Sequence, residues 1–130
     1  MIKKFIRIKN KNLFFSIFFS LIFYLVVVKC LSFNFLKNNL ESKKVFNLKK
    51  YKLNEILNYE EKISENLNIK QCLIRMCVLF SVLKKNAYKP ILFVGVKDDS
   101  SFKSHAWLSV QNKFIDLENR TEYKTILELS

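Results

Sequence analysis

The stretch that decides the fold is "IKQCLIRMCVLFSVLKKNAYKPILFVGVK", residues 69–97, in which one hydrophobic pattern gives way to another. Its first part, up to Asn86, repeats apolar side chains every three or four positions, which predicts an amphipathic helix of about sixteen residues. Asn86 is expected to take the left-handed conformation that ends such a helix. The rest is rich in β-forming residues, with Pro90 at its start, where a missing N–H does least harm. The sequence therefore predicts a helix followed by a strand.

Two further strands are expected downstream of this stretch. They are "SHAWLSV", residues 104–110, and "KFIDLEN", residues 113–119, with a tight turn at Gln111 and Asn112 between them. The small and acidic residues "DDSS", residues 98–101, form a turn before the first of them. A helix followed by an antiparallel meander belongs to the α+β class, with the helix packed on the sheet.

The N-terminal part, residues 1–36, begins with basic side chains and continues into the uncharged run "LFFSIFFSLIFYLVVV", residues 13–28. Crossing a bilayer takes roughly 20 apolar residues. The segment from Leu13 to Leu36 reaches that length if the side chain of Lys29 extends so that its ammonium group lies at the membrane surface. No small-x-small cleavage site for a signal peptide follows. The segment is expected to form a helix that is either buried in the fold or lying in a membrane.

The middle part, residues 37–68, is polar and rich in Lys and Asn. Leu53, Ile56 and Leu57 follow the spacing of an amphipathic helix, and Glu60 extends the same stripe. Residues 69–130 are then expected to form the α+β part of the fold.

Composition limits the classes of function. The chain has 130 residues, which suits one domain, and its net charge of +12 attracts anionic surfaces. A basic motif interleaved with aromatic residues is absent from the sequence, so no nucleic-acid partner is expected. The cysteines Cys30, Cys72 and Cys77 are odd in number and form no CxxC pair, so neither a disulfide framework nor a zinc site is expected. Free thiols in a reducing cytosol are the simpler interpretation.

His105 is the only histidine in the chain. It is either a structural residue bonded to a backbone carbonyl or a general base, which needs a nucleophile and an acid. Cys72 lies in the first turn of the predicted helix, where free N–H groups and the helix dipole favour the nucleophilic thiolate. The same N–H groups would stabilise an oxyanion. Cys77 lies in mid-helix on the apolar face and is expected to be packing.

Asp116 is the favoured acid because of its parity with His105. In a hairpin with a two-residue turn, opposing residue numbers sum to an odd number, so both side chains point to the same face as diagonal neighbours. Such neighbours are about 7–8 Å apart at Cα, within reach of an imidazole and a carboxylate. Glu118 has the same parity and is the alternative.

The ordered set of these residues resembles the transglutaminase-like protease of lasso-peptide biosynthesis, the stand-alone C-terminal half of the split B protein. The resemblance covers residues 69–127. The matching positions are a C-L-x-R helix start, a G-V strand end, an F-x-x-H-A-W motif and a later acid: Cys72, Leu73 and Arg75; Gly95 and Val96; Phe102, His105, Ala106 and Trp107; Asp116. The chain departs from the family at Asn86 and Asn112, where glycine is usual, and Asn preserves such turns.

The resemblance implies that residues 69–130 form a transglutaminase/papain-like catalytic core, in which the nucleophile helix packs on an antiparallel sheet. It also implies a cysteine peptidase that removes the leader from a ribosomally made lasso precursor. Cys72 would attack the scissile carbonyl, His105 would deprotonate the thiol, and Asp116 would orient the imidazole. Arg75 would be either a peptide-binding group or a structural ion-pair partner. Trp107 would be a substrate contact, a cleft wall or a core residue.

The same resemblance implies a set of partners: the lasso precursor peptide, a leader-recognition protein and an ATP-dependent lasso cyclase. It implies no metal and no cofactor in the peptidase itself. The expected location is the cytoplasm, in association with the membrane if residues 1–36 lie there. Two other functions stay open: another transglutaminase-like acyl-transfer enzyme, and a membrane-anchored binding protein with an idle triad.

Overall fold

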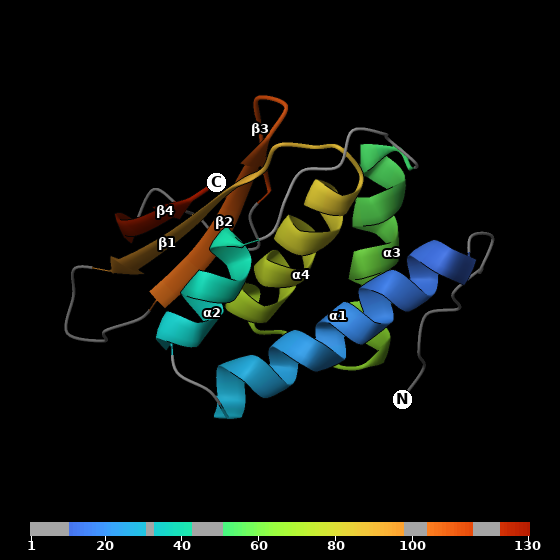
Figure 1. Ribbon diagram of the computed structural model, residues 1–130, viewed down its shortest axis with the longest axis horizontal. Coiled ribbons are helices and arrows are strands. Elements are labelled where there is room, and N and C mark those ends of the chain that lie inside the picture. The colour runs from blue at the N-terminus through green and yellow to red at the C-terminus, as the bar shows by residue number, and fades with distance from the viewer. Residues whose placement is uncertain (1–10, 31–32, 43–50, 98–103, 116–122) are drawn as a thin grey trace.

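The computed structural model describes residues 11–30, 33–42, 51–97, 104–115 and 123–130. In these residues, helices precede an antiparallel sheet, so the predicted α+β class is confirmed (Figure 1). The helices are α1 (Lys11–Cys30), α2 (Phe33–Glu41), α3 (Leu53–Asn66) and α4 (Cys72–Lys85). The strands are β1 (Ile91–Lys97), β2 (Ser104–Val110), β3 (Lys113–Ile115) and β4 (Tyr123–Leu129).

The sheet has the strand order β3-β2-β1-β4. The predicted meander supplies β1, β2 and β3, and β4 adds to the free edge of β1 with a register shift between Val94 and Gly95. The sequence analysis did not predict β4. Ile126 on this edge strand is 60% exposed, so the hydrophobic alternation that identifies a half-buried strand is weak there.

The turn between β2 and β3 is the predicted one. Val110 pairs with Lys113, which leaves Gln111 and Asn112 as a two-residue turn. Both have positive φ, at 52° and 61°, as the tight hairpin turns of twisted antiparallel strands require. The odd sum of opposing residue numbers therefore holds along the described part of this hairpin.

The predicted left-handed cap at Asn86 is wrong by one residue. Asn86 has φ −109°, and Ala87 has the positive φ of 66°. The Asn86 side chain donates from Nδ2 to the carbonyl of Val82 at 2.8 Å, and its backbone N–H bonds to Leu83. These bonds hold Asn86 in the last turn, so the chain reverses at Ala87, and Tyr88 N–H returns to the Leu83 carbonyl at 3.0 Å.

Helix α4 is the centre of the fold. Almost every side chain from Ile74 to Lys84 is buried, as expected for a helix that is apolar on all sides. It packs against β1 and β2 on one side and against α1 and α3 on the other (Figure 1). The sheet, α4 and the outer helices thus form successive layers.

The N-terminal part contains two helices instead of the single expected one. One stripe of α1 is fully buried in the core that α4 also enters: Leu13, Ile17, Leu21, Tyr24 and Val27. Tyr24 joins α1 to α2 because its hydroxyl donates to Oδ1 of Asn39 at 3.1 Å, and burial raises the pKa of Tyr24 to about 12. The alternative of a helix buried in the fold therefore holds for one side of α1.

By length and composition, α1 would also suit a bilayer, with 20 residues and a mean hydropathy of 2.4. A core helix or a signal sequence meets the same criteria.

The two faces of the sheet differ in what they contact. Side chains alternate between faces along a strand. On one face, apolar residues join the core that contains α4: Leu92, Val94, Ala106, Leu108 and Val110. On the other face, His105 and Trp107 of β2 lie beside Phe93 and Gly95 of β1.

Candidate active site

Cys72 is the first residue of α4, as the sequence predicted. Gln71 before it is extended, with φ −66° and ψ 121°, and its carbonyl accepts the N–H of Arg75 at 3.2 Å. The Gln71 side chain makes no capping hydrogen bond, so it leaves the N–H groups of the first turn to other acceptors. Cys72 is half-buried against the core. A nucleophilic thiol and its oxyanion site need free N–H groups at such a position, and the nucleophilic role of Cys72 stays a prediction.

The other two cysteines differ from Cys72 in their surroundings. All three thiols are free, with Cys30 exposed and Cys77 buried. Burial, together with the nearby Cys72, raises the pKa of Cys77 to about 12. Cys77 therefore stays a neutral thiol at physiological pH and serves as packing. In the described ranges, no three His, Cys, Asp or Glu side chains gather as a metal site would need.

His105 is the second residue of β2 and lies opposite Gly95 of β1. It is only 1% exposed. Its ring lies 5.6 Å from that of Trp107 and 5.0 Å from that of Tyr123, measured between centroids. Tyr123 was missed by the sequence reasoning, because only the pairing of β4 with β1 brings it close to β2. The one available signal was an aromatic residue at the start of a short β-rich run.

Gly95 allows the Trp107 ring to lie flat across β1. A Cβ atom at Gly95 would lie 2.8 Å and 2.9 Å from two carbons of the Trp107 ring and 3.0 Å from the carbonyl oxygen of Lys124. The same ring stacks on Phe93 at 5.7 Å and on His105 at 5.6 Å. The missing side chain at Gly95 thus determines where Trp107, and through it His105, can lie.

Replacement of Gly95 by alanine is expected to destabilise the protein by about 1–3 kcal/mol, because the added methyl group overpacks a buried ring. Trp107 must shift, and the His105 ring that stacks on it shifts too. Thermal unfolding measures the loss, and Trp107→Phe in the same chain should recover part of it by removing the clashing ring atoms. A Gly95→Ala protein with wild-type stability would contradict this account of the aromatic stack.

Cys72 and His105 lie on elements that pack together. Helix α4 contacts β2, and the starts of the two elements lie toward the same end of the molecule (Figure 1). His105 points to the sheet face opposite that of Ala106, which joins the core that contains α4, so the described residues do not show the thiol beside the imidazole. Their pairing stays a prediction. Asp116, Glu118 and Phe102 lie outside the described residues.

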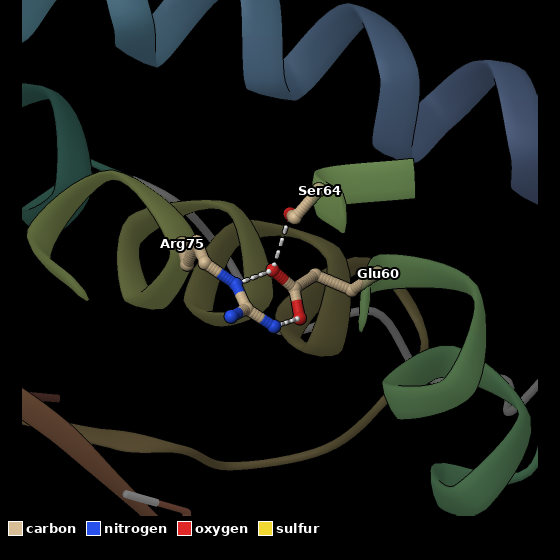
Figure 2. A network of polar contacts seen from close by, with 3 residues as sticks. All are labelled: Glu60, Ser64 and Arg75. Atoms are coloured by element: carbon tan, nitrogen blue, oxygen red, sulfur yellow. Dashed lines mark hydrogen bonds and ion pairs between the residues drawn. The ribbon is translucent and has the colours of Figure 1, made fainter. Parts of the chain in front are cut away.

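Arg75 forms an ion pair with the carboxylate of Glu60 on α3 (Figure 2). Its Nε donates to Oε1 of Glu60 at 2.7 Å, and its second terminal nitrogen donates to Oε2 at 3.0 Å. Ser64 donates its hydroxyl to Oε1 as well, at 2.8 Å. Burial alone would lower the pKa of Arg75, but the hydrogen bonds and charge of Glu60 outweigh it and raise that pKa. This geometry supports the structural alternative for Arg75, while a contact with substrate stays a prediction.

Replacement of Arg75 by methionine should destabilise the protein by about 3–5 kcal/mol, because it leaves the buried carboxylate of Glu60 without its cation. The double variant Glu60→Leu/Arg75→Met should regain most of that stability, since both charges are then gone. Chemical denaturation measures both. A single variant as stable as the wild type would refute the structural role. A stable double variant without activity would indicate that Arg75 also takes part in substrate binding.

Comparison with known proteins adds one match. A family model described as the transglutaminase-like superfamily matches residues 49–128, which include α3, Cys72, His105 and Asp116. Neither a curated protein nor a solved structure shows a significant match to the chain.

Proposed function

The chain belongs to the transglutaminase-like superfamily, and we propose that it is a cysteine peptidase that removes the leader from a lasso-peptide precursor. Membership of the superfamily indicates activity of the cysteine peptidase or acyl-transfer type. The observation that carries the proposal is the position of Cys72 on the first turn of α4, with His105 on the strand that packs beside this helix. The order of these residues in the chain supports the lasso-peptide assignment.

In the proposed reaction, the Cys72 thiol loses its proton to His105 and the sulfur attacks the scissile carbonyl. The N–H groups of the first turn of α4 stabilise the oxyanion. The C–N bond then breaks, the leaving amine takes the proton from His105, and a thioester to Cys72 remains. Water hydrolyses the thioester and restores the thiol. Asp116 holds the imidazole in the tautomer that this proton transfer needs.

The proposed partners follow from the substrate. The precursor peptide would be presented by a separate leader-recognition protein, and an ATP-dependent cyclase would close the ring after cleavage. The acyl-transfer alternative uses the same residues: Cys72 attacks the carbonyl of a Gln side chain or another amide, ammonia leaves, and an amine in place of water attacks the resulting thioester.

Incubation of the full chain with a candidate precursor and recognition protein, read by mass spectrometry, tests the proposal. Hydrolysis gives two fragments whose masses sum to that of the precursor plus one water. An acyl-transfer enzyme instead gives one species lighter than its reactants by ammonia, which would overturn the peptidase assignment. If the precursor stays intact under conditions in which the recognition protein binds it, the assignment of a lasso-peptide precursor as the substrate is overturned.

Asp116→Asn is expected to slow cleavage by at least about tenfold, because the amide favours the wrong imidazole tautomer; the serine-protease triad, the standard example, loses about 10⁴ in turnover. Glu118→Gln is the matched control and should have a much smaller effect. Single-turnover rates locate the loss in the chemical step and not in precursor binding. A crippled Glu118→Gln protein beside a near-normal Asp116→Asn protein would identify Glu118 as the orienting acid.

A further inference from the structure

The side of α1 opposite its buried stripe is apolar and open to solvent. We call it the α1 outer face, and it consists of Phe15, Phe19, Ile22, Phe23 and Val26, which are 41–63% exposed. The positions recur at helical spacing, and the Phe15 and Phe19 rings stack at 6.0 Å between centroids. Scattered exposed apolar residues are common in soluble proteins, but a contiguous row of large ones marks an interaction surface.

Polar and cationic groups border this face. Lys11 and Lys29, near the two ends of α1, are both exposed. Beside the phenylalanines lies an open hollow of about 410 Å³ between α1 and the end of α4, with Ser16, Ser20, Ser81 and Lys85 in its lining. An apolar row with lysines and hydroxyls at its border matches the order of acyl chains and phosphate head groups at a membrane surface.

We propose that the protein docks on anionic lipid bilayers through the α1 outer face, with α1 lying in the plane of the membrane and its buried stripe still in the core. Phe15, Phe19 and Val26 enter the acyl region, and Lys85 faces lipid phosphates together with Ser16 and Ser20. This inference does not depend on the proposed peptidase function.

The buried stripe distinguishes in-plane docking from a transmembrane helix. To cross the bilayer, α1 would have to withdraw Leu13, Ile17, Leu21, Tyr24 and Val27 from the core, where each is at most 2% exposed. A spanning α1 would place these five side chains among acyl chains, but it would leave the sides of α3 and α4 that they cover exposed to water, at about 25 cal/mol for each Å² of apolar surface. In-plane docking causes no such exposure.

Charge favours an anionic bilayer over a second copy of the chain as the occupant. Two copies that each carry a net charge of +12 repel one another, which opposes a dimer through this face. The same charge is attracted by a membrane with acidic lipids, at about 1 kcal/mol for each Lys or Arg near the surface.

Flotation of the full chain with lipid vesicles tests the proposal. We expect binding to vesicles of phosphatidylcholine with phosphatidylglycerol, weak binding to phosphatidylcholine alone, and release in alkaline carbonate. The double variant Phe19→Asn/Val26→Asn should bind at least about tenfold more weakly, because it removes apolar groups from the acyl region. Ile126→Asn is the matched control, since Ile126 is 60% exposed on β4, and it should bind like the wild type.

Thermal unfolding of the three proteins in the absence of lipid shows whether they are folded, and all three should be, because each substituted side chain is half-exposed or more. Resistance to alkaline carbonate would overturn in-plane docking in favour of a spanning helix. Equal weakening by Ile126→Asn, or no weakening by the double variant, would overturn the assigned surface. A wild-type dimer in light scattering that the double variant abolishes, with no vesicle binding by either protein, would identify a second copy as the occupant.

Discussion

Replacement of Cys72 by alanine is expected to abolish cleavage of the precursor while the protein still unfolds at about the wild-type temperature. The thiol is the only group in the proposed reaction that forms a bond to the substrate, and residual cleavage without it should be several orders of magnitude slower. Cys72 is half-buried at the very start of α4, so its truncation removes little packing. Initial rates by chromatography and thermal unfolding by circular dichroism measure the two effects.

Cys77→Ala is the matched control, on the same helix. It should retain most of the activity and lose about 1 kcal/mol of stability, because its side chain fills the core. Alkylation of the native protein should modify Cys72 and spare Cys77, whose pKa of about 12 and complete burial keep it unreactive. Equal loss of activity in the two variants, both folded, would contradict the assignment of Cys72 as the nucleophile.

Deletion of residues 1–30 is expected to leave a chain without cooperative unfolding and with poor solubility. The deletion removes the buried stripe of α1 and uncovers the side of α4 on which it packs. Circular dichroism melting and the soluble fraction after expression measure the outcome. The effect should exceed that of any single substitution described here, because it removes five core side chains at once.

Single substitutions on the two sides of α1 also test whether the helix is part of the core, and they disrupt the fold less than the deletion does. Leu21→Ala should cost about 2–5 kcal/mol, since Leu21 is fully buried. Phe19→Ala should stay within about 0.5 kcal/mol in the absence of lipid, since Phe19 is 63% exposed. A soluble deletion variant with full thermal stability would show that α1 is only an anchor and not part of the core.

The local elements were predictable because their signals are local. The apolar repeat of residues 72–85 predicted α4, and the stripe of Leu53, Ile56 and Leu57 predicted α3. The residue types at Gln111 and Asn112 predicted a turn that requires positive φ. The start of α4 at Cys72, and with it the candidate nucleophile, followed from the same pattern. The exact end of α4 was wrong, because the Asn86 side chain bonds within the last turn. The break between α1 and α2 and the strand β4 were not predicted.

The sequence by itself thus determined the α+β class, the central helix, the hairpin and the candidate residues Cys72 and His105. Tertiary structure alone decided which distant residues meet. It placed β4 beside β1 and so brought Tyr123 to His105, and it closed Arg75 onto Glu60 across two helices. It also turned one side of α1 inward and left the other exposed, although both are apolar in sequence. The physical reason is that periodicity reports the conformation of a single segment, whereas contacts depend on which buried surfaces of separate segments fit together.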